Sequence, residues 1–187
     1  KTKIGLPEVM LGLLPGATGT TKLSRLISLP AALDIMLTGK QLDAKRALRL
    51  GMIDDVVPPS ILIHAAKAAA KRLIKKECPR KKQPLLQRLL TLPLISHAVI
   101  YTARQQVLKK TFGNYPAPLA ILDTIQYGLN KPIKTAIAYE AKKFGELSVS
   151  PEAKQLINIY FATTALKKET FIKIVLPLIV IVLPLAV

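Results

Sequence analysis

The chain has 187 residues and a hydrophobic content of 50%, which suits one domain, or at most two, with a sizeable core. Its 28 Lys and Arg residues against 11 Asp and Glu residues give a formal net charge of +17, which indicates an anionic partner such as nucleic acid, a lipid surface or a phosphorylated substrate. Trp is absent and aromatic residues make up 5% of the chain, which argues against the base-stacking platforms of single-strand nucleic-acid binders.

Residues 1–75 have the pattern of a compact α/β domain, with apolar residues at helical spacing between glycines and prolines. Asp43 and Ser60 are each expected to cap a helix, because their side chains can accept a hydrogen bond from a first helical turn. The elements expected in chain order are the end of a strand at residues 2–6, helices at 19–27 (with Thr20 and Thr21 near its cap), 31–37 and 44–50, a strand at 52–57, and a helix from Ser60 to about Ile74.

Beyond residue 75 the predicted strands stop. Residues 75–83, KKECPRKKQ, form a charged break that contains Pro79, and we expect a solvated linker there rather than a binding patch. The helices expected beyond it cover residues 85–90, 98–109, 119–129, 135–143 and 152–165.

The last stretch, residues 171–187, is almost wholly aliphatic and contains Pro177 and Pro184. Its uncharged part, residues 174–187, would span only about 21 Å as a helix, short of the roughly 30 Å hydrocarbon core of a bilayer. Both prolines are also expected to interrupt the helical hydrogen bonds. We therefore expect a shifted reading frame here rather than a membrane span.

Cys78 is the only cysteine, which excludes an internal disulfide and a cysteine-built metal site and favours a reducing compartment such as the cytoplasm. His64 and His97 lie far apart, with no carboxylate or cysteine at the spacing of metal ligands, so no metal site is expected. No segment matches a nucleic-acid-binding module, so no nucleic-acid partner is expected.

Residues 5–20, GLPEVMLGLLPGATGT, contain a Pro-Glu step, an apolar stretch and a glycine-bearing loop that leads into a helix. Three later segments continue the pattern in order, LTGK at 37–40, AKRALRL at 44–50 and GMID at 51–54. This series resembles the enoyl-CoA hydratase family, whose fold is called the crotonase fold.

Further along, residues 112–118 (FGNYPAP), 139–141 (YEA) and 144–147 (FGEL) resemble the connector in the α subunits of fatty acid oxidation complexes. In those proteins the connector joins the hydratase domain to an NAD-binding 3-hydroxyacyl-CoA dehydrogenase domain. The resemblance covers about residues 3–170. Because no glycine follows Gly145, the Gly-rich dinucleotide loop of such a domain is absent, and no NAD site is expected in this chain.

The resemblance implies an α/β fold, the C-terminal part of a crotonase-type β/α spiral followed by a mostly helical connector. Residues 1–75 would be the C-terminal half of the hydratase domain, residues 76–170 the connector, and residues 171–187 an aliphatic tail of unclear origin. The chain would thus be a fragment of a larger enzyme.

The resemblance also implies the site. Glu8 matches the second of the family's two catalytic glutamates, which acts as acid/base at the substrate α-carbon and helps to hold the water. Gly16 and Gly19 would shape the active-site loop, in which Thr18 stands where the family usually has Gly. The other glutamate and both oxyanion N–H donors belong to family segments upstream of Lys1, so the chain alone is expected to be inactive.

The function expected is that of a cytoplasmic β-oxidation multienzyme that hydrates trans-2-enoyl-CoA to 3-hydroxyacyl-CoA. Its substrate would be an acyl-CoA thioester, its NAD would bind in the dehydrogenase domain outside this chain, and its partner would be a thiolase β subunit. Two alternatives remain open. One is a non-catalytic crotonase-like remnant, tethered to a membrane by residues 174–187, and the other is a basic nucleic-acid binder.

Overall fold

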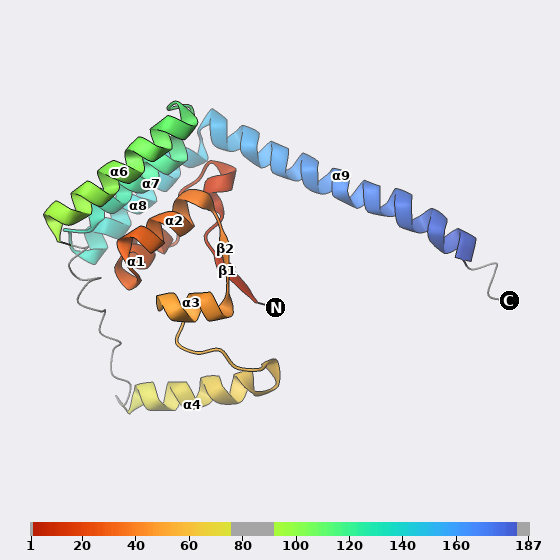
Figure 1. Cartoon of the computed structure of the whole chain (residues 1–187), viewed down its shortest axis with the longest axis horizontal. Coiled ribbons are helices and arrows are strands. Elements are labelled where there is room, and N and C mark those ends of the chain that lie inside the picture. The colour runs from red at the N-terminus through yellow and green to blue at the C-terminus, as the bar shows by residue number, and fades with distance from the viewer. Residues whose placement is uncertain (1, 76–91, 183–187) are drawn as a thin grey trace.

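The computed structural model describes residues 2–75 and 92–182 of the chain, and Figure 1 labels most of the elements. The first part contains strands β1 (Lys3–Gly5) and β2 (Gln41–Asp43), the 3₁₀ turns η1 (Glu8–Leu11) and η2 (Pro59–Ile61), and helices α1 (Gly19–Leu26), α2 (Leu29–Thr38), α3 (Ala44–Leu50) and α4 (Leu62–Ile74). The second part contains helices α6 (Pro93–Thr111), α7 (Pro116–Gly128), α8 (Ile133–Ser148) and α9 (Pro151–Val182).

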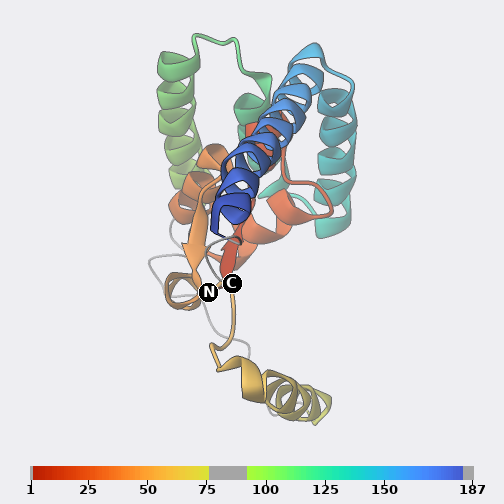
Figure 2. The same ribbon diagram turned by 90° about the vertical axis from the view of Figure 1, so that its right-hand side faces the viewer.

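Helices α6, α7 and α8 lie together and pack against α1 and α2 to form the body of the molecule (Figures 1 and 2). α1 contacts both α7 and α8, and α2 contacts both α6 and α7. α9 contacts η1 and α8 and then runs away from the body, whereas α4 lies apart near the opposite end (Figure 1). The η1 turn that contains Glu8 is thus contacted by α2 from the first part of the chain and by α9 from the second.

The two strands form one antiparallel ladder, in which Lys3 lies opposite Asp43 and Gly5 opposite Gln41. The strand expected at residues 2–6 is confirmed. The strand expected at residues 52–57 is wrong, because this segment is irregular and none of its residues is buried. Alternation of apolar residues forms a strand only where a neighbouring strand completes the ladder, and the described residues pair β1 and β2 only with each other.

The helices at 31–37 and 44–50 are confirmed, and their ends follow the local signals. α2 ends at Gly39 and α3 at Gly51, both with left-handed backbones of φ 65° and φ 82°, which glycine adopts without strain. The Asp43 side chain accepts a hydrogen bond of 2.8 Å from the Arg46 N–H and so caps α3, as expected.

One of the expected caps is wrong. Ser60 lies inside the η2 turn, and the residue before α4 is Ile61, which has no side-chain cap. The helix at 19–27 is confirmed, with Thr20 and Thr21 buried in its first turn, near the residue Thr18 that precedes it. A capping side chain needs an extended backbone at the residue just before the helix, which the 3₁₀ turn prevents at Ser60.

The four helices of the second part are each longer than their apolar periodicity predicts. Pro93, Pro116 and Pro151 occupy first helical positions, where the missing N–H has no intrahelical partner to lose. The α9 backbone continues past Pro177 to Val182, so this proline does not end the helix, although its missing N–H leaves a gap in the helical hydrogen bonds. The helix expected at residues 85–90 and most of the charged linker at 75–83 lie outside the described residues.

One hydrophobic core joins the two parts of the chain. Its buried members include Ile27 and Met36 from the first part and Ile100, Ile121 and Leu147 from the second. Because these side chains form a single cluster, α1 and α2 depend on α6, α7 and α8 for burial. The domain division near residue 75 stays a prediction.

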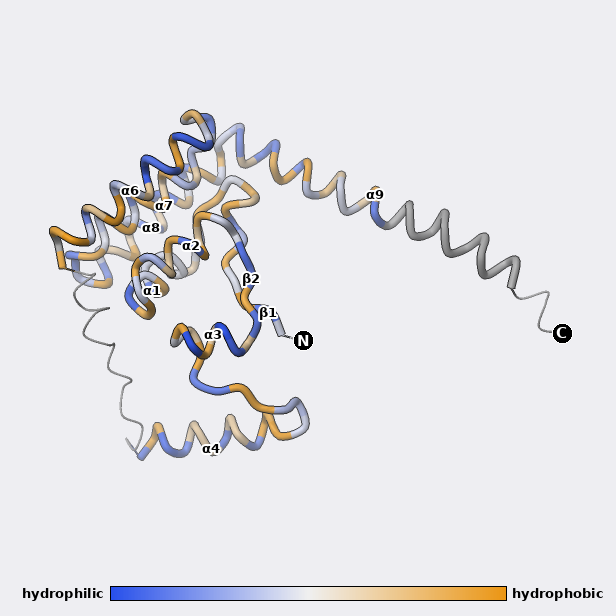
Figure 3. The backbone as a smooth tube through the Cα atoms, viewed as in Figure 1, coloured by the Kyte–Doolittle hydropathy of each residue, from blue (hydrophilic) through white to orange (hydrophobic). Residues whose placement is uncertain are grey.

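No residue of α4 is buried. Its hydrophobic side chains, among them Ile63 and Ile74 with exposed fractions of 68% and 81%, alternate with hydrophilic ones along the helix (Figure 3). In the described part of the chain, no helix combines the length and apolar character needed to span a bilayer.

The Asp43 cap predicts a dependence of stability on pH. The Arg46 N–H, with Lys3 and Arg49 acting in the same direction, lowers the pKa of Asp43 below its ordinary value of 3.8. A depressed folded pKa contributes stability above the unfolded pKa, and the contribution is lost as the pH falls through the folded value. We expect Asp43→Ala to lower the melting temperature at pH 7 by about 2–4 °C, and the difference to shrink towards pH 3.

Circular dichroism melts between pH 3 and pH 7 would measure this difference. Asp43→Asn is the matched control, because it keeps an acceptor oxygen without a titrating charge, and its smaller effect should not change with pH. An Asp43→Ala difference that stays constant over this range would contradict the prediction.

Candidate active site

Glu8 begins the η1 turn, three residues after the end of β1. Glu8 as a whole is half-buried, but its Oε2 atom is fully buried and has no hydrogen-bond partner among the described residues. Buried carboxylate oxygens in folded proteins are nearly always paired, because an unpaired one loses its hydration without compensation. This atom is therefore placed to bind a ligand or to exchange a proton.

The backbone around Glu8 is held tightly. The Leu13 N–H donates to the Glu8 carbonyl (3.1 Å), and the turn ends at Gly12 with a left-handed φ of 73°. A Cβ at Gly12 would lie 2.9 Å from the Cα of Ala153 at the start of α9, so a side chain is excluded there. The close approach of α9 fixes the turn that carries Glu8.

Tyr115 holds the same turn from the second part of the chain. Its hydroxyl donates to the carbonyl of Val9, the residue after Glu8. Burial raises the pKa of the Tyr115 phenol, an effect that the Gly12 N–H partly offsets. Because the shift is upward from 10.0, the phenol stays protonated at neutral pH and keeps its hydrogen for Val9.

The loop before α1 is constrained by space at its two glycines. A Cβ at Gly16 would lie 2.9 Å from the ring of Phe144, and a Cβ at Gly19 would lie 3.2 Å from Pro15. The left-handed backbone falls instead on Ala17 and Thr18, with φ values of 50° and 72°. Thr18 thus occupies a backbone conformation that glycine adopts without strain.

The N–H groups of the first turn of α1 all have acceptors. The Gly19 N–H donates to the Gly16 carbonyl (2.8 Å) and the Thr20 N–H to the Pro15 carbonyl (3.2 Å), so the loop folds back onto the helix. The Thr21 N–H donates to Oε2 of Glu140, a carboxylate on α8 that is only 2% exposed (2.8 Å).

Sequence reasoning missed Tyr115, Glu140 and Phe144 as residues of this region. Tyr115 lies in the FGNYPAP segment, and Glu140 and Phe144 lie in or beside the YEA and FGEL segments, all of which carried the resemblance to the connector. The motifs were a signal in the sequence. No local pattern, however, shows which residue a side chain contacts more than 100 positions away, as Glu140 contacts Thr21 119 positions earlier.

The described residues contain no group of three or more His, Cys, Asp or Glu side chains that could hold a metal ion. A groove of about 380 Å³ lies beside Tyr115, between the turn that precedes α7 and the first turns of α9, where Leu156 and Ile159 line it.

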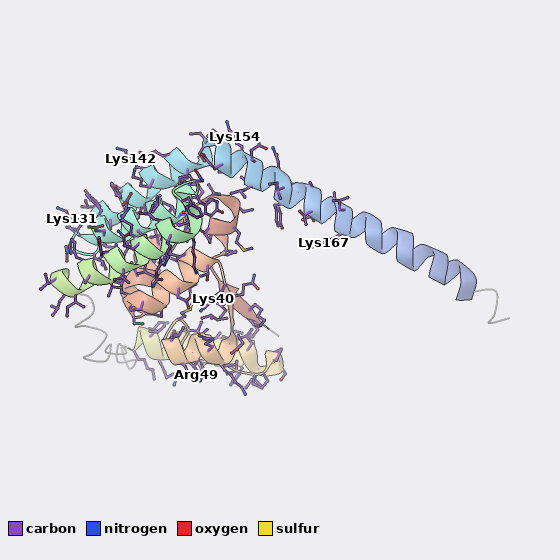
Figure 4. All side chains as sticks on the ribbon, turned by 45° about the horizontal axis from the view of Figure 1, so that its top comes forward. Lys40, Arg49, Lys131, Lys142, Lys154 and Lys167 are labelled. Carbon is purple, nitrogen blue, oxygen red and sulfur yellow. The ribbon has the colours of Figure 1, made fainter. Side chains whose placement is uncertain are left out.

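The positive charge is spread over several elements (Figure 4). Some of the cations are paired, for example Arg104 with Asp123 (2.5 Å) and Lys143 with Glu146 (2.7 Å). Basic residues on different parts of the chain, labelled in Figure 4, include Lys40, Arg49, Lys131, Lys142, Lys154 and Lys167.

A buried carboxylate oxygen with no hydrogen-bond partner in the described part of the chain, in a turn that follows a strand, defines a candidate acid/base site of an enzyme. Residues 1–113 match the sequence model of the enoyl-CoA hydratase/isomerase family. The chain belongs to this family.

Relatives extend the match through the second part of the chain. The fatty acid oxidation complex subunit alpha of Shewanella amazonensis is 48% identical over 171 residues, which is 91% of this chain and 24% of that protein. The same subunit of Vibrio cholerae is 47% identical over 169 residues, 90% of this chain and 24% of that protein. The chain spans about a quarter of the length of these relatives, and the expected resemblance to such subunits is confirmed.

A solved structure supports the fold. The carnitinyl-CoA hydratase from Mycobacterium avium superposes with a TM-score of 0.51 and 25% sequence identity, over 87% of this chain and 49% of that one. The expected fold class, the C-terminal part of a crotonase-type fold with a mostly helical continuation, is confirmed.

The backbone at Thr18 generates a prediction about stability. A left-handed backbone costs a residue other than glycine about 1–2 kcal/mol, whereas glycine loses about 0.5–1 kcal/mol more entropy on folding. We therefore expect Thr18→Gly to raise the free energy of unfolding by about 0.5–1 kcal/mol in urea titrations. Thr102→Gly, at an exposed position within α6, should lower it by a similar amount. A loss of stability in both variants would contradict the assignment of strain to Thr18.

Proposed function

We propose that this chain supplies the acid/base carboxylate of a hydratase that converts trans-2-enoyl-CoA to 3-hydroxyacyl-CoA, and that Glu8 is this carboxylate. The observation that carries the proposal is the buried Oε2 atom of Glu8, which has no hydrogen-bond partner among the described residues. In a chain of the enoyl-CoA hydratase/isomerase family, such an atom fits a group whose partners arrive with substrate and water.

The chemistry requires a group that handles protons beside the thioester. Water adds its oxygen to the β-carbon and a proton to the α-carbon, and the conjugated double bond is lost. A carboxylic acid near the α-carbon can deliver that proton, and its carboxylate form can accept a hydrogen bond from the attacking water. Glu8 would fill both roles, and the strand end, the η1 turn and the Tyr115 contact would limit its movement.

Gly16 and Gly19 would give the loop its shape. The Phe144 ring leaves too little room for a Cβ at Gly16, and Pro15 leaves only a tight fit for one at Gly19, so the loop backbone lies close to these side chains. This tight packing supports the proposal that the loop is a fixed wall of the site rather than a mobile flap.

The other partners follow from the relatives. Their name, fatty acid oxidation complex subunit alpha, supports a fatty acyl substrate, here an acyl-CoA thioester, and an assembly with other subunits. The NAD-using dehydrogenase domain, the thiolase β subunit and the cytoplasmic location rest on the resemblance of the sequence motifs alone. In this view residues 1–75 are hydratase, residues 76–170 are the connector towards the dehydrogenase domain, and NAD binds outside the described residues.

The resemblance places a second glutamate and the oxyanion donors before residue 1, so the test uses a complete relative as host. In a chimera, this chain replaces the matching segment of the Shewanella amazonensis subunit, whose own hydration of crotonyl-CoA is measured first as the reference. The loss of ultraviolet absorbance of the enoyl thioester follows the reaction. We expect Glu8→Gln in the chimera to lower kcat by about 10²–10⁴-fold.

Glu146→Gln is the control, because Glu146 is an exposed carboxylate on α8 whose loss should leave kcat unchanged. In the 187-residue chain, Glu8→Gln should not lower the melting temperature, since none of the residues that the structure describes hydrogen-bonds to the buried oxygen. An active chimera in which Glu8→Gln keeps full activity would refute the role of Glu8. A chimera that is inactive beside an active host would favour the non-catalytic remnant.

A further inference from the structure

Glu140 is a buried carboxylate that the proposed reaction does not use. It lies on α8, beyond the segment that matches the family model, and its side chain is 2% exposed. Burial of a carboxylate is costly unless hydrogen bonds compensate it, so such a residue calls for a specific partner. That partner is the Thr21 N–H, which lies 2.8 Å from Oε2 of Glu140.

The start of α1 explains why a distant residue is needed. A helix leaves its first N–H groups without intrahelical acceptors, and the residue before the helix usually supplies a side-chain oxygen. Here that residue is Thr18, whose left-handed backbone and lack of a side-chain cap leave the role unfilled. The loop carbonyls satisfy Gly19 and Thr20, but neither reaches Thr21.

The Glu140 carboxylate fits this position electrostatically. The N-terminus of a helix carries a partial positive charge, and a negative side chain there is stabilising. The hydrogen bond is also charge-assisted, which makes it stronger than a bond between neutral groups. Glu140 therefore serves as the cap of a helix 119 residues away in the sequence.

Helix α8, which carries Glu140, also contacts the loop before α1. Phe144 follows Glu140 by four positions, so both side chains leave α8 on the same face. The Phe144 ring lies against Gly16, so one face of α8 contacts the loop at Gly16 and the helix start at Thr21.

We propose that Glu140 is a positioning residue of the hydratase site, which holds the loop at residues 15–18 and the start of α1 in place through the Thr21 N–H. The connector is then a structural part of the site and not only a link to another domain. This inference rests on the proposed function for the meaning of the loop, but the contact itself is tested without substrate.

The experiment uses hydrogen exchange followed by NMR on the full 187-residue chain. Glu140→Ala should speed exchange at the amides of Gly19, Thr21 and Lys22 by about 10–100-fold, because a buried donor loses its acceptor. Core amides such as that of Ile121 should keep their rates. Glu140→Gln should return the rates to within about threefold of the original, since an amide oxygen can still accept the hydrogen bond.

Glu146→Ala is the matched control, a carboxylate on the same helix that is exposed and paired with Lys143, and it should change none of these rates. Should Glu140→Ala fail to fold, a scalar coupling across the hydrogen bond between the Thr21 nitrogen and the Glu140 carboxyl carbon is measured in the unmodified chain. Its absence would overturn the proposal, as would equal acceleration at Ile121 and Thr21, or no recovery in Glu140→Gln.

These outcomes are distinct from failure of the proposed function. If Glu8→Gln abolishes hydration while Glu140→Ala leaves the amides of Gly19, Thr21 and Lys22 protected, the reaction stands and the positioning role falls. If these amides respond as expected while Glu8→Gln has no effect on hydration, the contact stands and the role of Glu8 falls.

Discussion

The start of α1 depends on a carboxylate that the neighbouring sequence does not provide. Because Thr18 adopts a left-handed backbone, it cannot cap α1 as an extended residue would, and the Thr21 N–H takes its acceptor from Glu140 instead. This contact requires α8 to lie against α1. With α8 in place, Phe144 closes on Gly16, and the buried faces of α7 and α2 complete the same core.

The parts of the fold that could be predicted from the sequence are those decided by nearby residues. Asp43 caps α3 three residues away, and Gly39 and Gly51 end their helices through their own backbone freedom. The errors occur where the outcome depends on distant partners or on the turn type. Residues 52–57 alternate like a strand but have no neighbouring strand among the described residues, and Ser60 loses its capping role to a 3₁₀ turn.

The residues of the candidate site fall into the same two groups, those that the local sequence indicates and those that depend on distant partners. Glu8, Gly16 and Gly19 stand in a contiguous motif, so resemblance alone could single them out. The side chains that hold the motif in place, Tyr115 and Glu140, lie beyond the segment that matches the family model and reach the motif only through the tertiary fold. No spacing rule in the sequence indicates that the Tyr115 hydroxyl donates a hydrogen bond to the Val9 carbonyl, 106 positions earlier. Residues needed for the geometry of a site can therefore lie outside the segment that defines its family.

The separation of Thr21 from Glu140 also bears on synthesis. A ribosome that adds about 5–20 residues per second needs roughly 6–24 s to proceed from one to the other, since 119 residues separate them. Throughout this interval the nascent chain holds the loop and α1 without their distal carboxylate, while the core residues of α6 and α7 are still being added. Native order in the first part of the chain is thus delayed until α8 emerges, so the nascent segment must remain soluble for many seconds before it can close.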